Sequence, residues 1–155
     1  MKQKFIDLYM DWAVRAAQLS HARRLQVGAV IVKDDSVISY GYNGMPAGWD
    51  NNCEDETVEL YSGYEGAIHR TVLKTKPEVL HAERNSLDKL ARRGGSGGAG
   101  ATMFATHAPC LECAKSIYGA GITSVYYGEE YRSQDGIHFL KTCGVKIEKA
   151  SNSVK

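Results

Sequence analysis

Two short motifs constrain this chain more than any other feature: His81-Ala82-Glu83 and Pro109-Cys110-Leu111-Glu112-Cys113. Imidazole nitrogen and thiolate sulfur are ligands that Zn²⁺ favours in tetrahedral sites. Cys110 and Cys113 lie three positions apart on a predicted helix, so they share one face and can chelate one ion. With His81 as the third ligand, the set leaves one position for water, as catalytic zinc sites do. The fold must therefore bring the two motifs together.

Glu83 is the residue that favours a catalytic role for this set. Both motifs lie at predicted helix starts, where partial positive charge stabilises thiolates and lowers the pKa of cysteine. Glu83 follows His81 by two positions and is not needed as a ligand. Zinc lowers the pKa of bound water to about 7, so hydroxide becomes available to attack the amidine carbon of an aminopyrimidine. Glu83 would take the water proton, deliver it to ring N3 and later protonate the departing ammonia.

Each motif alone has a simpler explanation. A lone Cys-x-x-Cys is also found as a redox pair or as half of a structural zinc knuckle, and a lone His-Ala-Glu is a chance triplet. Together, in this order, with Pro109 before the first cysteine and a predicted strand between them, they are typical of zinc nucleobase deaminases.

The remaining pattern alternates short apolar runs with helical stripes, and it predicts a three-layer α/β/α domain over residues 1–155. Helices are expected over residues 2–19, 80–93, 110–118 and 134–142, and strands over 27–32, 37–40, 102–106, 124–127 and 145–147. The first two strands form a β-hairpin. Residues 47–79 are hardest to interpret; we expect a helix around 65–74, ended by Pro77.

Composition excludes several function classes. The 155 residues carry a net charge of +1, which argues against a strongly basic nucleic-acid binder. No apolar run is long enough to cross a membrane, and the first ten residues lack a signal-peptide core. We therefore expect a cytoplasmic protein. In that reducing compartment the close cysteine pair is more suited to metal or redox chemistry than to a structural bridge.

The chain resembles the cytidine deaminase-like superfamily, and within it the deoxycytidylate (dCMP) deaminases of phage and eukaryotic type. The resemblance rests on Gly41-Tyr42-Asn43-Gly44-Met45-Pro46, His81-Ala82-Glu83-Arg84-Asn85 and Pro109-Cys110-Leu111-Glu112-Cys113-Ala114-Lys115, and on the long segment before His81. It implies a five-stranded mixed sheet with helices on both faces. It also implies hydrolysis of dCMP to dUMP and ammonia.

The resemblance assigns roles to individual residues. His81, Cys110 and Cys113 would hold zinc, Glu83 would be catalytic, and the substrate would contact Asn43, Ala82, Asn85 and Tyr131. Asn43 matches an asparagine that reaches the nucleoside sugar, and Tyr131 a tyrosine associated with the phosphate. The same loop is tied to an effector site in dCMP deaminases, so Asn43 and Gly44 are also candidates for effector binding.

The resemblance further implies a homo-oligomer, commonly a hexamer, activated by dCTP and inhibited by dTTP with Mg²⁺. Two rival functions share the zinc core: a deaminase acting on tRNA or single-stranded DNA, and a non-catalytic zinc or nucleotide-binding module. The first needs a basic track that the chain lacks, and the second leaves Glu83 without a purpose. We expect neither a nucleic-acid partner nor a membrane.

Two questions stay open at the level of sequence. Cys53 and His69 are either part of a second, structural zinc site or a buried thiol and a surface imidazole. The phosphate of a nucleotide substrate needs cations or backbone N–H groups, and the candidates are Arg23, Arg24, Lys74, Lys76, Arg132 and Lys141. His107 stands where related chains often have an apolar residue.

Overall fold

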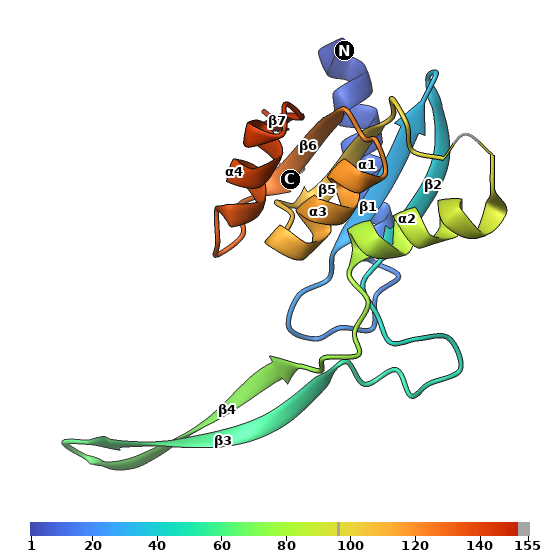
Figure 1. The fold of residues 1–155 in the computed structure, drawn as a ribbon. Coiled ribbons are helices and arrows are strands. Elements are labelled where there is room, and N and C mark those ends of the chain that lie inside the picture. The colour runs from blue at the N-terminus through green and yellow to red at the C-terminus, as the bar shows by residue number, and fades with distance from the viewer. Residues whose placement is uncertain (96, 152–155) are drawn as a thin grey trace.

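Five strands form one mixed sheet in the order β2-β1-β5-β6-β7 in the computed structural model, which describes residues 1–95 and 97–151 (Figure 1). The strands are β1 (Gly28–Lys33), β2 (Ser36–Tyr42), β5 (Thr102–His107), β6 (Ser124–Glu129) and β7 (Lys146–Lys149). β1 pairs antiparallel with β2 and β5, whereas β5, β6 and β7 are parallel. The five-stranded mixed sheet expected from the sequence is confirmed.

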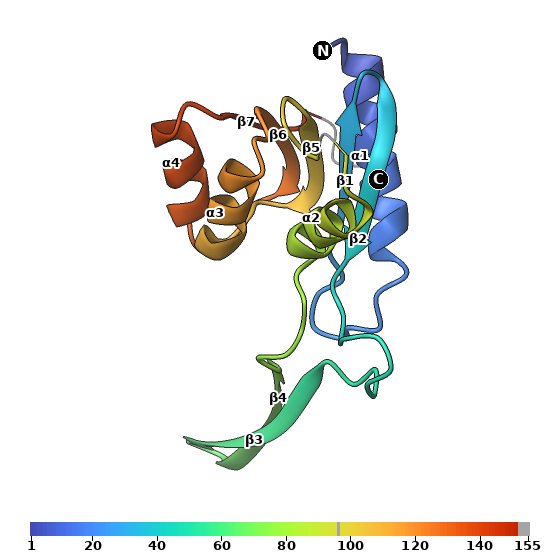
Figure 2. The same cartoon turned by 45° about the vertical axis from the view of Figure 1, so that its right-hand side comes forward.

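Among the helices that the structure describes, α1 (Gln3–Ala17) alone covers one face of the sheet (Figure 2). Its buried side chains recur at helical spacing and meet the alternate residues Val30 and Val32 of β1. Phe104 is fully buried at the centre of this layer, with its ring 5.1 Å from that of Tyr9 and 5.3 Å from that of Tyr126. Aromatic packing therefore ties α1 to β5 and β6.

The opposite face packs against α2 (Ala82–Arg93), α3 (Leu111–Gly119) and α4 (Asp135–Thr142). It presents the intervening side chains of the same strands, among them Ile31, Met103 and Val125, all at most 1% exposed. Strands buried on both faces read as continuous apolar runs, as these do. The predicted three-layer α/β/α architecture is confirmed.

The predicted hairpin of β1 and β2 is also confirmed. Asp34 and Asp35 have positive φ angles of 50° and 55°, as the two central residues of a type I′ turn require. The Asp35 carboxylate accepts a hydrogen bond of 2.7 Å from the Tyr9 hydroxyl, which attaches the turn to α1. None of the described helices combines the length and apolar character needed to cross a membrane.

The expected helix around residues 65–74 is wrong. This segment is β4 (Gly66–Thr75), which pairs antiparallel with β3 (Glu54–Gly63) in a separate two-stranded sheet that projects from the body of the molecule (Figures 1 and 2). β-Branched residues on both strands favour this pairing. The sequence did not predict it because every residue from Asp55 to Thr71 is exposed, so no buried face imposes an alternating pattern.

Candidate active site

Two helix starts meet at the end of β5 and bring the two motifs together. His81 is the N-cap of α2 and Cys110 the N-cap of α3, and both have extended backbones before their helices begin. Nδ1 of His81 lies 3.3 Å from Sγ of Cys113 and 3.6 Å from Sγ of Cys110. All three ligand atoms lie within 4.8 Å of one another.

These distances fit a tetrahedral zinc site. Zinc–sulfur bonds of about 2.3 Å and zinc–nitrogen bonds of about 2.0–2.1 Å at tetrahedral angles place nitrogen and sulfur about 3.6 Å apart. The three ligands are those that Zn²⁺ prefers, and within the described part of the chain no other histidine, cysteine or acidic residue joins the group. A metal held here would therefore keep one coordination position open.

Hydrogen bonds within the metal group favour ionisation of the Cys110 thiol. The pKa of Cys110 is lowered to about 4, chiefly because Cys113 hydrogen-bonds to it and because His81 lies beside it. The pKa of Cys113 is raised by the same hydrogen bond and by burial, and the pKa of His81 is raised by its hydrogen bond with Cys110. A metal ion that binds both sulfur atoms must therefore displace the proton that Cys113 favours.

Glu83 lies in the first turn of α2 and is only 4% exposed. Its Oε2 is 3.8 Å from Sγ of Cys113, and burial raises the pKa of its carboxyl group. No ion pair among the described residues involves Glu83. A buried carboxyl group that lies beside a metal site and forms no ion pair is suited to accept and release protons.

One side of the metal group faces a surface cavity. His81, Glu83 and Cys110 line it together with three of the predicted substrate residues, Asn43, Ala82 and Tyr131. Further lining residues come from four other segments: Arg24, Leu25, Val27, Thr75, Val79, His107 and Ala108. Asn85 and Gly44 do not line this cavity.

Asn43 and Asn85 make structural hydrogen bonds. Oδ1 of Asn43 accepts a hydrogen bond of 2.8 Å from the N–H of Val27, and its Nδ2 donates one of 2.8 Å to the carbonyl of Leu25. Nδ2 of Asn85 donates to the carbonyl of Tyr42 at 2.9 Å. Asn43 thus fixes one wall of the cavity, and Asn85 ties α2 to the end of β2.

Gly44 acts through its backbone. Its N–H donates to the carbonyl of Leu80 at 3.1 Å, and its carbonyl accepts from the N–H of Leu80 at 2.8 Å. Because Leu80 directly precedes His81, this bridge fixes the chain as it enters the metal site. The loop that contains Asn43 and Gly44 therefore supports the chain that leads into His81.

Sequence reasoning missed Thr75 and left Arg24 among six candidate cations. Thr75 ends β4, in the segment whose pattern was not readable, and no local signal distinguishes it. His107 was visible only as a departure from related chains, and it lines the cavity from the end of β5. Burial lowers the pKa of His107, which favours its neutral form.

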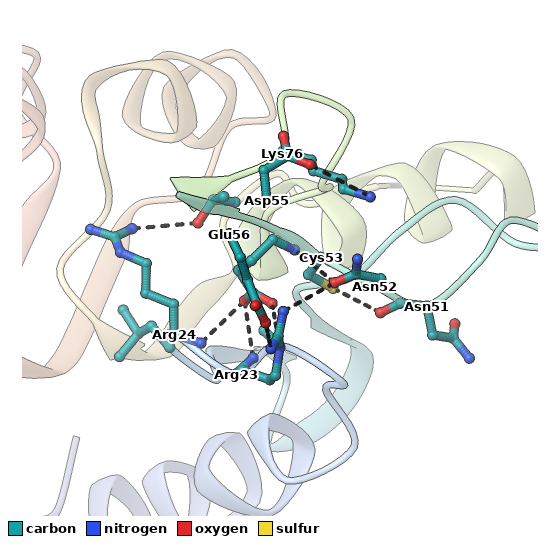
Figure 3. A network of polar contacts seen from close by, with 12 residues as sticks. Arg23, Arg24, Asn51, Asn52, Cys53, Asp55, Glu56 and Lys76 are labelled. Atoms are coloured by element: carbon teal, nitrogen blue, oxygen red, sulfur yellow. Dashed lines mark hydrogen bonds and ion pairs between the residues drawn. The ribbon is translucent and has the colours of Figure 1, made fainter. Parts of the chain in front are cut away.

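Cys53 and His69 do not form a second metal site. Cys53 precedes β3 and is 1% exposed, and its Sγ lies 3.4 Å from the carbonyl oxygen of Asn51 (Figure 3). His69 is exposed on β4 and pairs with Leu60, six positions further along β3 than Glu54. Six residues of strand span roughly 20 Å. The alternative, a buried thiol and a surface imidazole, is the one that the structure supports.

Comparisons with known proteins agree with this geometry. Residues 3–129 match the cytidine and deoxycytidylate deaminase zinc-binding region. The chain is 37% identical to ComE operon protein 2 of Bacillus subtilis over 81% of its length, and 30% identical to deoxycytidylate deaminase of Saccharomyces cerevisiae over 97%. It spans 60% and 46% of the lengths of these two relatives.

A solved structure with a similar fold is that of dCMP deaminase from the cyanophage S-TIM5 in complex with dCMP and dUMP. It has a TM-score of 0.81 and 40% sequence identity, and the match covers 96% of this chain and 98% of that one. The predicted resemblance to deoxycytidylate deaminases is confirmed. The chain belongs to the cytidine and deoxycytidylate deaminase family.

Proposed function

We propose that this protein hydrolyses dCMP to dUMP and ammonia with the help of a zinc ion. The observation that carries the proposal is the position of Glu83, a buried carboxyl group without an ion-pair partner beside the cluster of His81, Cys110 and Cys113. The similarity to a cyanophage enzyme solved with dCMP and dUMP supports the choice of substrate.

Three side chains would hold the metal: His81 through Nδ1, and Cys110 and Cys113 through Sγ. When bound, zinc supplies Lewis acidity that lowers the pKa of water to about 7. In the proposed hydrolysis the oxygen of a water molecule adds to C4 of the cytosine ring, and the bond from C4 to the amino nitrogen breaks. Glu83 would pass the first proton of that water to N3 and the second, from the added hydroxyl group, to the amino group that leaves as ammonia. Burial supports this role because it raises the pKa of the Glu83 carboxyl group and so favours uptake of a proton.

Substrate binding is assigned to the cavity residues. Asn43, Ala82 and Tyr131 line the cavity and are our candidates for direct contacts with the nucleotide. Asn85 lies outside the cavity lining and would act indirectly, through the carbonyl of Tyr42. The low net charge of +1 gives no support to a polynucleotide substrate.

Regulation and assembly are also part of the proposal. Activation by dCTP and inhibition by dTTP with Mg²⁺ require that the two triphosphates bind two conformations with different affinities. Asn43 and Gly44 are the candidate effector residues, because the bridge from Gly44 to Leu80 leads directly to His81. Equal activity with and without either triphosphate would refute the proposed regulation. Sedimentation velocity would test for the homohexamer.

The enzymatic proposal is tested by mixing zinc-loaded protein with dCMP and following dUMP by chromatography and ammonia by a coupled assay. Glu83→Gln should keep its zinc and lose about 10²- to 10⁴-fold in kcat. Glu112→Gln is the matched control, because Glu112 is exposed on α3 and pairs with Lys115. Absence of both products, with or without dCTP, would refute the proposal, and full turnover by Glu83→Gln would refute the role of Glu83.

A further inference from the structure

The outer side of α1 carries large apolar side chains that no described element covers (Figure 2). α1 packs on the sheet through its buried residues, whereas Leu8, Trp12 and Leu19 remain 46%, 51% and 45% exposed. Together with Arg15 they follow one another at intervals of four, three and four residues, so they lie on one face of the helix. Leu19 belongs to this face because its N–H still donates to the carbonyl of Ala16 at 3.0 Å.

These four residues, Leu8, Trp12, Arg15 and Leu19, are named the α1 stripe, and they border a groove between α1 and β2. The groove is lined by Val30 of β1, by Tyr40 of β2 and by six residues of the α1 segment: Leu8, Asp11, Trp12, Arg15, Ala16 and Leu19. Tyr40 is exposed as well. The α1 stripe and Tyr40 therefore form one surface that is apolar except for two charges, and contiguous apolar surfaces of this kind mark interaction sites.

The neighbouring edge of the sheet is closed to an added strand. β2 is an edge strand, and side chains of α2 reach its outer side. Three alternate carbonyls of β2 accept hydrogen bonds from α2: that of Ile38 from Arg93, that of Tyr40 from Lys89 at 2.9 Å and that of Tyr42 from Asn85 at 2.9 Å. A peptide strand finds no free row of acceptors there, so a partner at this surface must pack on the side chains of α1.

The spacing of the α1 stripe is the same in both directions along the helix. A second α1 laid antiparallel across a two-fold axis therefore places Leu8 against Leu19 and Trp12 against Arg15, each contact occurring twice. The leucines bury one another at the two ends of the stripe, and a guanidinium group packs favourably on an indole ring at its centre. A second copy of this chain thus matches the whole stripe.

The charges of this surface also favour a second copy. No ion pair among the described residues involves Asp11 or Arg15. Arg15 donates one hydrogen bond of 2.8 Å to Gln18, which leaves further N–H donors of its guanidinium group. Asp11 precedes Trp12 directly, so in the antiparallel arrangement it comes beside Arg15 of the second copy. Each acidic and each basic group then gains an opposite charge.

We propose that the α1 stripe is a two-fold interface between copies of this chain, with the two α1 helices antiparallel. Each stripe is the binding surface of the other, so the contact closes on itself and doubles the assembly. Trp12 and Arg15 are the central residues, and these two residue types dominate the energies of many protein interfaces. This interface deepens the homo-oligomer of the proposed function and does not depend on the deamination reaction.

Sedimentation velocity of the full chain tests this interface. The double variant Leu8→Ser/Trp12→Ser should reduce the mass of the wild-type assembly to about half or less, because a two-fold contact joins copies in pairs. Trp49→Ser is the matched control, since Trp49 is 56% exposed and does not line the groove. The control should keep the wild-type mass, and thermal unfolding checks that each variant is folded.

Cysteine cross-linking tests the antiparallel orientation. When Leu8→Cys and Leu19→Cys proteins are mixed and mildly oxidised, disulfide-linked dimers should form beyond the background that the native cysteines give in the wild type. Neither variant should form them alone. In antiparallel helices the two copies of position 8 lie about 16 Å apart, beyond the roughly 7 Å that a disulfide spans between Cα atoms.

Two results would overturn the proposal. An assembled wild type whose mass is unchanged in Leu8→Ser/Trp12→Ser would place the interface elsewhere on the molecule. A wild type that is monomeric at every concentration would leave the α1 stripe to a different protein. Neither result bears on the hydrolysis of dCMP, because turnover is measured separately.

Discussion

Gly41 of β2 lies directly against Ala82, the first residue of α2. A methyl group added at Gly41 would come 2.4 Å from the carbonyl oxygen of Ala82 and 2.6 Å from the backbone nitrogen of Ser86. Both obstacles are backbone atoms, so they cannot move without moving the helix. Only glycine allows this close approach, which seats the first turn of α2, with His81 and Glu83, on the sheet.

Gly41→Ala should therefore displace the start of α2 and disturb the metal site. We expect the free energy of unfolding to fall by about 1–3 kcal/mol, the usual cost of inserting a group into a packed region, and the zinc content after dialysis to fall with it. Chemical denaturation and atomic absorption measure the two effects.

Gly119→Ala is the control for this substitution. Gly119 ends α3, and a methyl group there meets nothing within 4 Å, so its free energy of unfolding should stay within about 0.5 kcal/mol of wild type. A Gly41→Ala protein with wild-type stability and zinc content would contradict the close approach of β2 and α2.

Removal of zinc should destabilise the protein. A metal that binds only the folded state adds RT ln(1 + [Zn]/Kd), about 2.7 kcal/mol at a hundredfold excess over Kd. A chelator should therefore lower Tm of the wild type. Without chelator, Tm of Cys113→Ser should already be near this lower value, and the chelator should change it little. Cys143→Ser, at a half-buried thiol outside the metal group, should respond like the wild type. An equal Tm with and without chelator would argue against a metal bound in the folded state.

The metal group was predictable from sequence because its geometry is local. Cys110 and Cys113 share the first turn of α3, and His81 and Glu83 share the start of α2, so each half of the site is set by a few neighbouring residues. The sheet was predictable for a similar reason. Its central strands are buried on both faces and appear as unbroken apolar runs.

The cavity wall was not predictable because it depends on contacts between distant segments. Arg24 lines the cavity, and its backbone N–H is held by Glu54, thirty positions away. Glu54 and Thr75 lie in the β3–β4 hairpin, whose exposed faces carry no periodic signal. Nothing local distinguishes Arg24 from the other candidate cations, so the sequence could not show that it lines the cavity.

His107 should make stability depend on pH. Burial lowers the pKa of its imidazole below the usual value of 6.5, although Glu129 acts in the opposite direction. Between this lowered value and about pH 6.5 the unfolded chain binds more protons than the folded one. The stabilisation is complete above that window and is lost as the pH falls through it.

The free energy of unfolding of the wild type should therefore decrease more than that of His107→Gln when the pH is lowered from about 7.5 to about 5. Urea denaturation at the two pH values measures the difference. An identical decrease in the free energy of unfolding of wild type and His107→Gln would show that His107 does not contribute to the pH dependence of stability.

The outer part of the β3–β4 hairpin should open far more readily than the central sheet. Residues from Asp55 to Thr71 are exposed on both faces, and an isolated two-stranded hairpin is at best marginally stable in water. In β1, by contrast, Ala29, Val30 and Ile31 are completely buried. Amide hydrogens of the hairpin should exchange at least roughly a hundredfold faster than those of β1, as hydrogen-exchange mass spectrometry can measure. The root at Glu54 should be the exception, because this side chain is buried and holds two backbone N–H groups. Protection of residues 57–70 equal to that of β1, at every protein concentration, would contradict the prediction.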